Sequence, residues 1–112
     1  MNRWEVHDPG MKVALLQLNP TVGDLLGNSD LIARAARSAG PDIDLFVTSE
    51  LALLGYPPRD LLLNFDFVQR SWSVLGQLAQ DLADLPPLLV GLAESNPGDV
   101  GRPLFNSAAL LC

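Results

Sequence analysis

Apolar residues form four short runs along the chain, separated by polar stretches and two longer amphipathic stretches. Runs at residues 11–18 (MKVALLQL) and 42–49 (DIDLFVTS) are short and contain β-branched residues, which predicts two strands. The first run is nearly all apolar, so we expect its strand to be buried on both faces. Runs at residues 88–93 and 104–111 predict two further strands, which a turn rich in Asn, Pro and Gly would join as neighbours.

Two stretches with helical spacing lie between these strands. The first begins near Asn28, which we expect to be the N-cap, and the Gly40 and Pro41 pair should end it. The second covers residues 59–85 and predicts one long helix with a single buried stripe. The apolar positions of that stripe are Leu61, Phe65, Val68, Trp72, Leu75, Ala79 and Leu82. The order β-α-β-α-β-β predicts an α/β fold with helices packed on a sheet.

Length and composition limit the kind of protein this is. The chain has 112 residues, with 48% hydrophobic and 18% charged residues. Charged residues usually make up about 25% of a soluble domain, and a small domain buries a smaller fraction of its surface than a large one. We therefore expect a large buried interface or a missing second half, although no apolar run is long enough to suggest a membrane partner.

Charge and cysteine content narrow the possible partners and compartment. Seven basic residues stand against 13 acidic ones, giving a net charge of -6, so nucleic acid is not expected as a partner. The single cysteine, Cys112, excludes an internal disulfide and fits a reducing, cytoplasmic location. Residues 1–10 do not have the pattern of a signal peptide and are interpreted as an N-terminal extension, with His7 in solvent. Residues 11–112 would then form the domain.

Most familiar catalytic motifs are missing from the sequence. There is no GxxxxGK[ST] loop, no GxGxxG after a strand, and no HExxH, GxSxG or CxxC motif. Residues 98–101 contain glycines but fall between two strands, where a flexible turn is expected. The clearest candidate is Glu50, which follows the second predicted strand at the carboxyl edge of the sheet, where α/β proteins place working groups.

Two sequence motifs resemble one known family. The stretches MKVALLQLNPTVGDLLGN and SELALLGYPPRDLLL resemble the carbon-nitrogen hydrolase (nitrilase) superfamily, and specifically the glutaminase domain of glutamine-dependent NAD synthetases. The PPRDLLL continuation, residues 57–63, is more particular to the NAD synthetases. The resemblance also includes LLVGLAES and LFNSAALL, and therefore covers residues 11–112.

The resemblance implies a fold, an activity and two site residues. The activity would be the release of ammonia from glutamine, which the full-length protein would use to convert deamido-NAD to NAD. The fold would be a nitrilase-like α-β-β-α sandwich, here only its N-terminal part, in a protein that forms homo-oligomers. Glu50 would match the general base of a Glu-Lys-Cys triad, and Tyr56 would line the pocket for glutamine. The family's lysine and cysteine are expected beyond Cys112, so the chain alone is expected to be an inactive fragment. No cofactor is expected in this chain, because ATP and Mg²⁺ would belong to a separate synthetase domain.

One departure and two alternatives accompany this interpretation. The family usually has Pro before the catalytic Glu, whereas this chain has Ser49, which we expect to adjust the backbone at Glu50 without removing the site. Cys112 is expected to be an ordinary core position and not the nucleophile. The alternatives are a piece of a stand-alone nitrilase or amidase, and a module that kept the fold and lost the chemistry.

Overall fold

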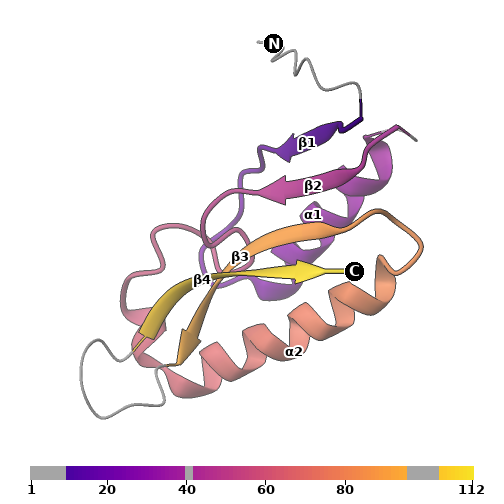
Figure 1. The fold of residues 1–112 in the computed structure, drawn as a ribbon. Coiled ribbons are helices and arrows are strands. Elements are labelled where there is room, and N and C mark those ends of the chain that lie inside the picture. Colours follow the sequence, from indigo (N-terminus) through magenta and orange to yellow (C-terminus); the bar gives the residue numbers. More distant parts are fainter. Residues whose placement is uncertain (1–9, 40–41, 96–103) are drawn as a thin grey trace.

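A computed structural model of the chain describes residues 10–39, 42–95 and 104–112. These residues form a four-stranded sheet in the order β1-β2-β3-β4. The strands are β1 (Val13–Leu16), β2 (Leu45–Thr48), β3 (Leu88–Ser95) and β4 (Leu104–Leu111). β1, β2 and β3 run parallel, and β4 returns antiparallel to β3 as the sequence predicts (Figure 1).

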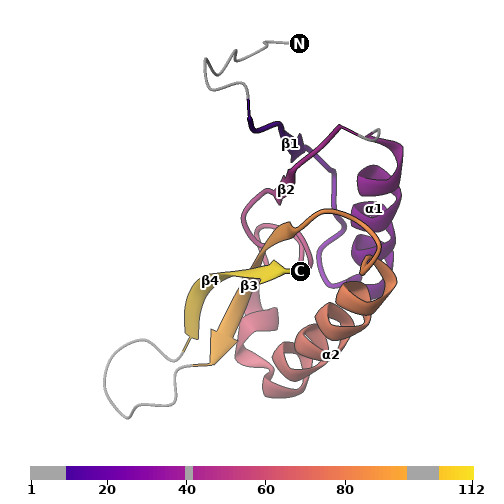
Figure 2. The same cartoon turned by 45° about the vertical axis from the view of Figure 1, so that its right-hand side comes forward.

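Both α-helices cover the same face of the sheet. α1 (Leu25–Ser38) contacts β1, α2 (Phe65–Asp81) contacts β3, and the two helices pack against each other. Figure 2 shows the helices on one side and the strands on the other. The core between them is apolar and includes Ile32, Phe46, Leu78, Leu88, Val90 and Leu92. The predicted α/β architecture is therefore confirmed. None of the helices in the described part of the chain is long and apolar enough to cross a membrane.

The opposite face of the sheet, which we call the open face, is not covered by another layer of described residues. The strand register aligns Leu15, Val47, Leu89 and Leu110 as one row on it. Leu15 is 67% exposed and Leu110 is 57% exposed. The expectation that the first strand is buried on both faces was therefore wrong, because side chains alternate along a strand and the helices cover only one side.

The first helix begins earlier than the sequence predicts. Asp24 is its N-cap and accepts a hydrogen bond from the Gly27 amide at 3.0 Å. Asn28, predicted to be the cap, lies instead in the first turn of α1 and is buried. The Asn28 prediction was wrong because its side chain binds two loops, as described below, and leaves the capping to Asp24. The helix ends at Ser38, and the Gly40 and Pro41 pair lies outside the described residues.

The second helical stretch is two helices and not one. A 3-10 helix, η1 (Arg59–Leu63), is followed by Asn64, whose extended backbone ends it. The Asn64 side chain then caps α2 by accepting a hydrogen bond from the Phe67 amide at 3.1 Å. This break turns Phe65 outward, where it is 65% exposed. The prediction of one continuous buried stripe over residues 59–85 was therefore wrong at its start, while Val68, Leu75 and Leu82 are buried.

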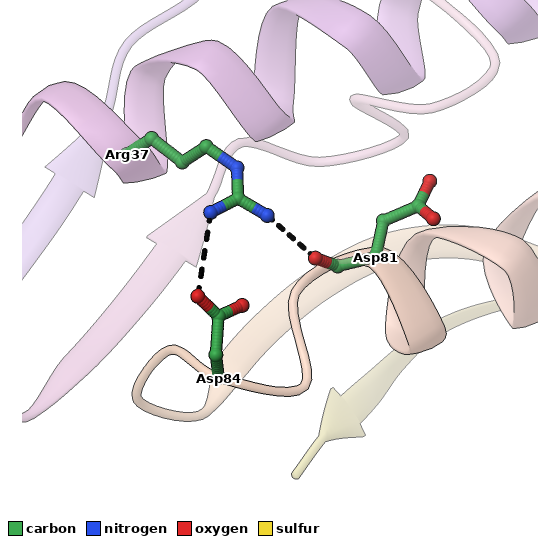
Figure 3. A network of polar contacts seen from close by, with 3 residues as sticks. All are labelled: Arg37, Asp81 and Asp84. Carbon is green, nitrogen blue, oxygen red and sulfur yellow. Dashed lines mark hydrogen bonds and ion pairs between the residues drawn. The ribbon is translucent and has the colours of Figure 1, made fainter.

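Arg37 joins the C-terminal ends of the two helices (Figure 3). Its Nη2 donates to the carbonyl oxygen of Asp81 at 2.6 Å, and its Nη1 lies 3.5 Å from a carboxylate oxygen of Asp84. The guanidinium thus sits beside the negative ends of two helix dipoles. Both charged side chains are largely in solvent, so this contact fixes geometry more than it adds stability.

Candidate active site

Glu50 lies two residues beyond Thr48, where β2 ends. Figure 1 shows that β1 and β2 end toward the same edge of the sheet. The chain from Ser49 to Leu51 passes over Gly91 of β3, very close to it. A Cβ atom at Gly91 would lie 2.7 Å from the Leu51 amide nitrogen and 2.8 Å from the Ser49 carbonyl oxygen. Gly91 also donates its amide to Thr48 Oγ1 at 3.2 Å. Glycine at this position therefore lets the segment that carries Glu50 rest on β3.

The backbone after Glu50 turns through an uncommon conformation. Leu51 has a φ of 52°, in the left-handed region that non-glycine residues rarely adopt. The turn is closed by the amides of Leu54 and Gly55, which donate to the Leu51 carbonyl at 3.1 and 2.9 Å. The four residues from Leu51 to Leu54 are all buried in the core. Core packing thus holds this strained turn and fixes the direction in which Glu50 leaves the strand.

The carboxylate of Glu50 has a partner on β4. Asn106 Nδ2 donates a hydrogen bond to Glu50 Oε1. The side chains of Asn106, Ala108 and Leu110 lie on the same face of β4, because every second residue of a strand points the same way. Leu110 is on the open face, so the contact between Asn106 and Glu50 lies there too. An open depression of about 360 Å³ surrounds the pair, and its lining comprises Thr48, Ser49, Glu50, Leu89, Gly91, Asn106, Ser107 and Ala108. Glu50 is exposed in this arrangement.

Tyr56 belongs to the loop that follows the buried turn. Its side chain is 64% exposed, and the peptide bond between Tyr56 and Pro57 is cis. The turn before Tyr56 is bound to the loop after β1, because the Gly23 amide donates to the Leu54 carbonyl at 2.9 Å. Glu50 and Tyr56 both follow β2 at the carboxyl edge. Within the described part of the chain, no hydrogen bond joins the two side chains.

Asn28 strengthens the same junction from inside. Its side chain accepts from the Thr21 amide and donates to the carbonyls of Thr21 and Leu53, at 2.8, 2.8 and 2.9 Å. Asn28 is 1% exposed, and all its polar atoms have partners. The loop after β1 and the turn after β2 are therefore held as one unit beneath the site.

The lysine and cysteine of this sequence lie at the other edge of the sheet. Lys12 precedes β1, where its amide donates to Asp44 at 2.7 Å and its Nζ lies 3.7 Å from Asp42. Cys112 follows β4, whose last residue pairs with the start of β3. Cys112 is exposed, so the expectation of a core position was wrong. It lies six residues from Asn106, about 20 Å along an extended strand. Neither side chain is placed to act with Glu50.

Two residues of this site were not predicted from the sequence, although both leave a signal there. Asn106 is a polar residue within the apolar run LFNSAALL, and Gly91 interrupts LLVGLA. A glycine inside a strand often marks the close approach of another backbone segment, and a polar residue there often has a hydrogen-bond partner on another element. The partner of each could not be predicted, because the Glu50 segment is distant from Asn106 and Gly91 in the sequence and contacts them only in the folded chain.

Other candidates give no further site. His7 and residues 98–101 lie outside the described residues. Among the residues with described positions, no group of three His, Cys, Asp or Glu side chains could hold a metal ion. Ser49 is exposed and accepts a hydrogen bond from Thr48 Oγ1 through its carbonyl at 3.1 Å. Its effect in place of proline stays a prediction.

Comparisons with known proteins give a consistent relationship. No protein-family model matches the chain. The glutamine-dependent NAD(+) synthetase of Synechocystis sp. is 41% identical over 103 residues, an alignment that covers 88% of this chain and 18% of that protein. The chain belongs to the glutamine-dependent NAD(+) synthetase family. It spans less than a fifth of the length of this relative.

Solved structures support the fold. The glutamine-dependent NAD(+) synthetase of Cytophaga hutchinsonii superposes with a TM-score of 0.78 at 20% identity, covering 90% of this chain and 17% of that one. An amidase from Nesterenkonia sp. superposes with a TM-score of 0.64 at 28% identity, over 90% of this chain and 38% of the amidase. A variant of this nitrilase-superfamily amidase carries the acetamide moiety of fluoroacetamide covalently at its active-site cysteine. The fold of this NAD synthetase relative is therefore nitrilase-like, and its described residues supply one helical layer and one sheet.

Proposed function

We propose that the chain supplies the general base and part of the glutamine pocket of a glutaminase that releases ammonia for NAD synthesis. The observation that carries the proposal is the placement of Glu50. Its carboxylate leaves the carboxyl edge of the sheet on a fixed turn, reaches the open face and has one oxygen bound by Asn106. The sequence relationship to glutamine-dependent NAD(+) synthetases supports glutamine as the substrate.

In the proposed reaction, the carboxylate of Glu50 accepts the proton of a cysteine thiol as the sulfur attacks the carboxamide carbon of glutamine. The tetrahedral oxyanion would be stabilised by a lysine. Its collapse breaks the carbon-nitrogen bond, the departing nitrogen takes up the proton, and ammonia leaves a thioester. Glu50 then accepts a proton from a water molecule as the water oxygen attacks the thioester. The carbon-sulfur bond breaks, the departing sulfur takes the proton back from Glu50, and glutamate and the thiol are released.

The lysine and the cysteine would come from residues other than Lys12 and Cys112, which lie at the opposite edge of the sheet. The 112-residue chain by itself is therefore expected to release no ammonia from glutamine. Ammonia would be used by a synthetase domain, where ATP and Mg²⁺ belong, and no step of the glutaminase reaction at Glu50 requires them.

Tyr56 is proposed to line the glutamine pocket. It follows the same buried turn as Glu50 and exposes most of its side chain. Tyr56→Phe should raise the KM for glutamine several-fold and change kcat little, because it removes a binding contact and leaves the base in place. Steady-state kinetics of glutamine hydrolysis, measured in the Synechocystis synthetase with residues 11–112 in place of its matching segment, check this. A loss confined to kcat would contradict it.

An exchange of segments tests the function of the chain. Residues 11–112 would replace the matching segment in the Synechocystis synthetase and, separately, in the Nesterenkonia amidase. We expect the synthetase hybrid to form NAD from glutamine and the amidase hybrid to lose hydrolysis of simple amides. Amidase activity in the second hybrid, with no glutamine use in the first, would favour the stand-alone amidase interpretation instead.

A further inference from the structure

We infer that Asn106 is a positioning residue for the catalytic base, which orients the Glu50 carboxylate toward the proton that it accepts. This inference rests on the proposed function of Glu50. It starts from the hydrogen bond in which Asn106 Nδ2 donates to Glu50 Oε1. An ionised carboxylate only accepts hydrogen bonds, so the amide nitrogen and not the amide oxygen of Asn106 must face it.

Both partners of this contact are anchored to the same strand. β4 pairs with β3 along its whole length, and Asn106 lies directly opposite Ala93. On the other side, the segment that carries Glu50 rests on Gly91, two residues earlier in β3. β3 therefore sets the distance between the amide and the carboxylate, and little conformational entropy remains to be lost when they bind.

The chemistry of the contact suits a base better than a salt bridge would. No Lys or Arg of the described residues forms an ion pair with Glu50. A neutral amide donor favours the charged carboxylate without adding a full positive charge that would oppose proton uptake. Because only Oε1 is engaged by Asn106, Oε2 is left to accept a proton.

A second amide-carboxylate pair provides a matched control. Gln77 Nε2 donates to Asp81 Oδ1 at 3.0 Å on the exposed surface of α2. Neither residue lines the depression around Glu50. Gln77→Ala removes a hydrogen bond of the same kind and leaves Glu50 untouched.

The kinetic test uses the Synechocystis synthetase hybrid that carries residues 11–112. In Asn106→Ala and Asn106→Asp, glutamine-driven NAD formation should fall about tenfold to a hundredfold while ammonia-driven formation stays unchanged. The loss should fall on kcat, with the KM for glutamine changed little, because the contacts that bind the substrate stay in place. Gln77→Ala should leave both rates unchanged.

A spectroscopic test needs no activity. In the 112-residue chain, the NMR signals of the Asn106 side-chain amide should follow the ionisation of Glu50 with pH, and Glu50→Gln should abolish that dependence. A response unchanged by Glu50→Gln would overturn the inference. So would Asn106 variants that raise only the KM for glutamine, or whose glutamine-driven and ammonia-driven rates fall equally. Retained glutaminase activity in Glu50→Gln would instead overturn the proposed function.

Discussion

Asn28 shows how one buried polar side chain can hold two loops beneath a site. Its amide makes three hydrogen bonds, one accepted from and one donated to Thr21, and one donated to Leu53. These bonds join the loop after β1 to the turn that follows Glu50. A buried polar group without its partner costs about 1–3 kcal/mol, so the removal of Asn28 should be felt well beyond its own helix.

We predict that Asn28→Ala lowers the free energy of unfolding by at least about 2 kcal/mol, because several buried polar groups lose their partner. Asp24→Ala is the control at the exposed cap of the same helix and should cost about 1 kcal/mol. Urea unfolding of the two variants measures both values. An Asn28→Ala loss no larger than that of Asp24→Ala would show that the Asn28 contacts add no stability.

The sequence indicated that Asn28 has a structural role, but the role that it predicted was wrong. An asparagine just before a periodic apolar stretch is typical of an N-cap, which is why Asn28 was assigned to that position. The contacts of Asn28 are with Thr21 and Leu53, seven and 25 residues away. Contacts across such separations depend on the fold, and helical spacing carries no information about them.

Among the elements, β3 organises the candidate site. It pairs with β2 on one side and β4 on the other, and it bears Gly91, which the Glu50 segment crosses. Trp72 of α2 also binds this strand, since its indole Nε1 donates to the Ala93 carbonyl at 3.1 Å. A change in β3 should therefore disturb the site more than an equal change elsewhere.

Two glycines allow a matched comparison. A methyl group at Gly91 would meet backbone atoms of the Glu50 segment, whereas one at Gly76 of α2 would meet nothing within 4 Å. Gly91→Ala should lower the free energy of unfolding by about 1–3 kcal/mol and reduce glutaminase activity in the synthetase hybrid. Gly76→Ala should raise stability by about 0.5–1 kcal/mol, because it lies inside a helix. Thermal unfolding and ammonia release measure both, and equal effects would contradict the close contact at Gly91.

At this scale the sequence predicted the strands better than the helix boundaries. The strand residues occur in short apolar runs that polar residues interrupt, so the number of strands, their order along the chain and the pairing of the last two could be anticipated. The apolar spacing continued through Asn64, so the break between η1 and α2 was missed. The backbone at Asn64 and its cap on Phe67 decide that boundary, and neither changes the spacing.

For the whole molecule, the open face accounts for the apolar excess of the composition. The row formed by Leu15, Val47, Leu89 and Leu110 has no covering layer among the described residues. The sequence indicated that more apolar surface exists than one small domain can bury, but it could not locate that surface. Its location follows from the placement of both helices on the same side of the sheet.

We predict that the 112-residue chain self-associates through the open face, because burial of apolar surface is favourable. Light scattering at micromolar concentration should give a mass above 12.0 kDa. Leu15→Lys, which places a charge on the row, should shift the chain toward the monomer. Leu63→Lys is the control, since Leu63 is exposed on η1 and away from the row. A wild-type monomer, or equal effects of the two variants, would argue against the open face as the contact.

The role of Glu50 as the proposed base of a glutaminase is tested most directly by the ratio of glutamine-driven to ammonia-driven NAD formation in Glu50→Gln. Gln keeps the size of the side chain but cannot accept the thiol proton, so in the synthetase hybrid this ratio should fall by about 10²–10⁴. Glu94 lies near the end of β3, whereas Glu50 follows β2. Glu94→Gln makes the same chemical change at this second carboxylate and should leave the ratio unchanged. An unchanged ratio in Glu50→Gln, with both rates retained or both lost together, would contradict the assignment.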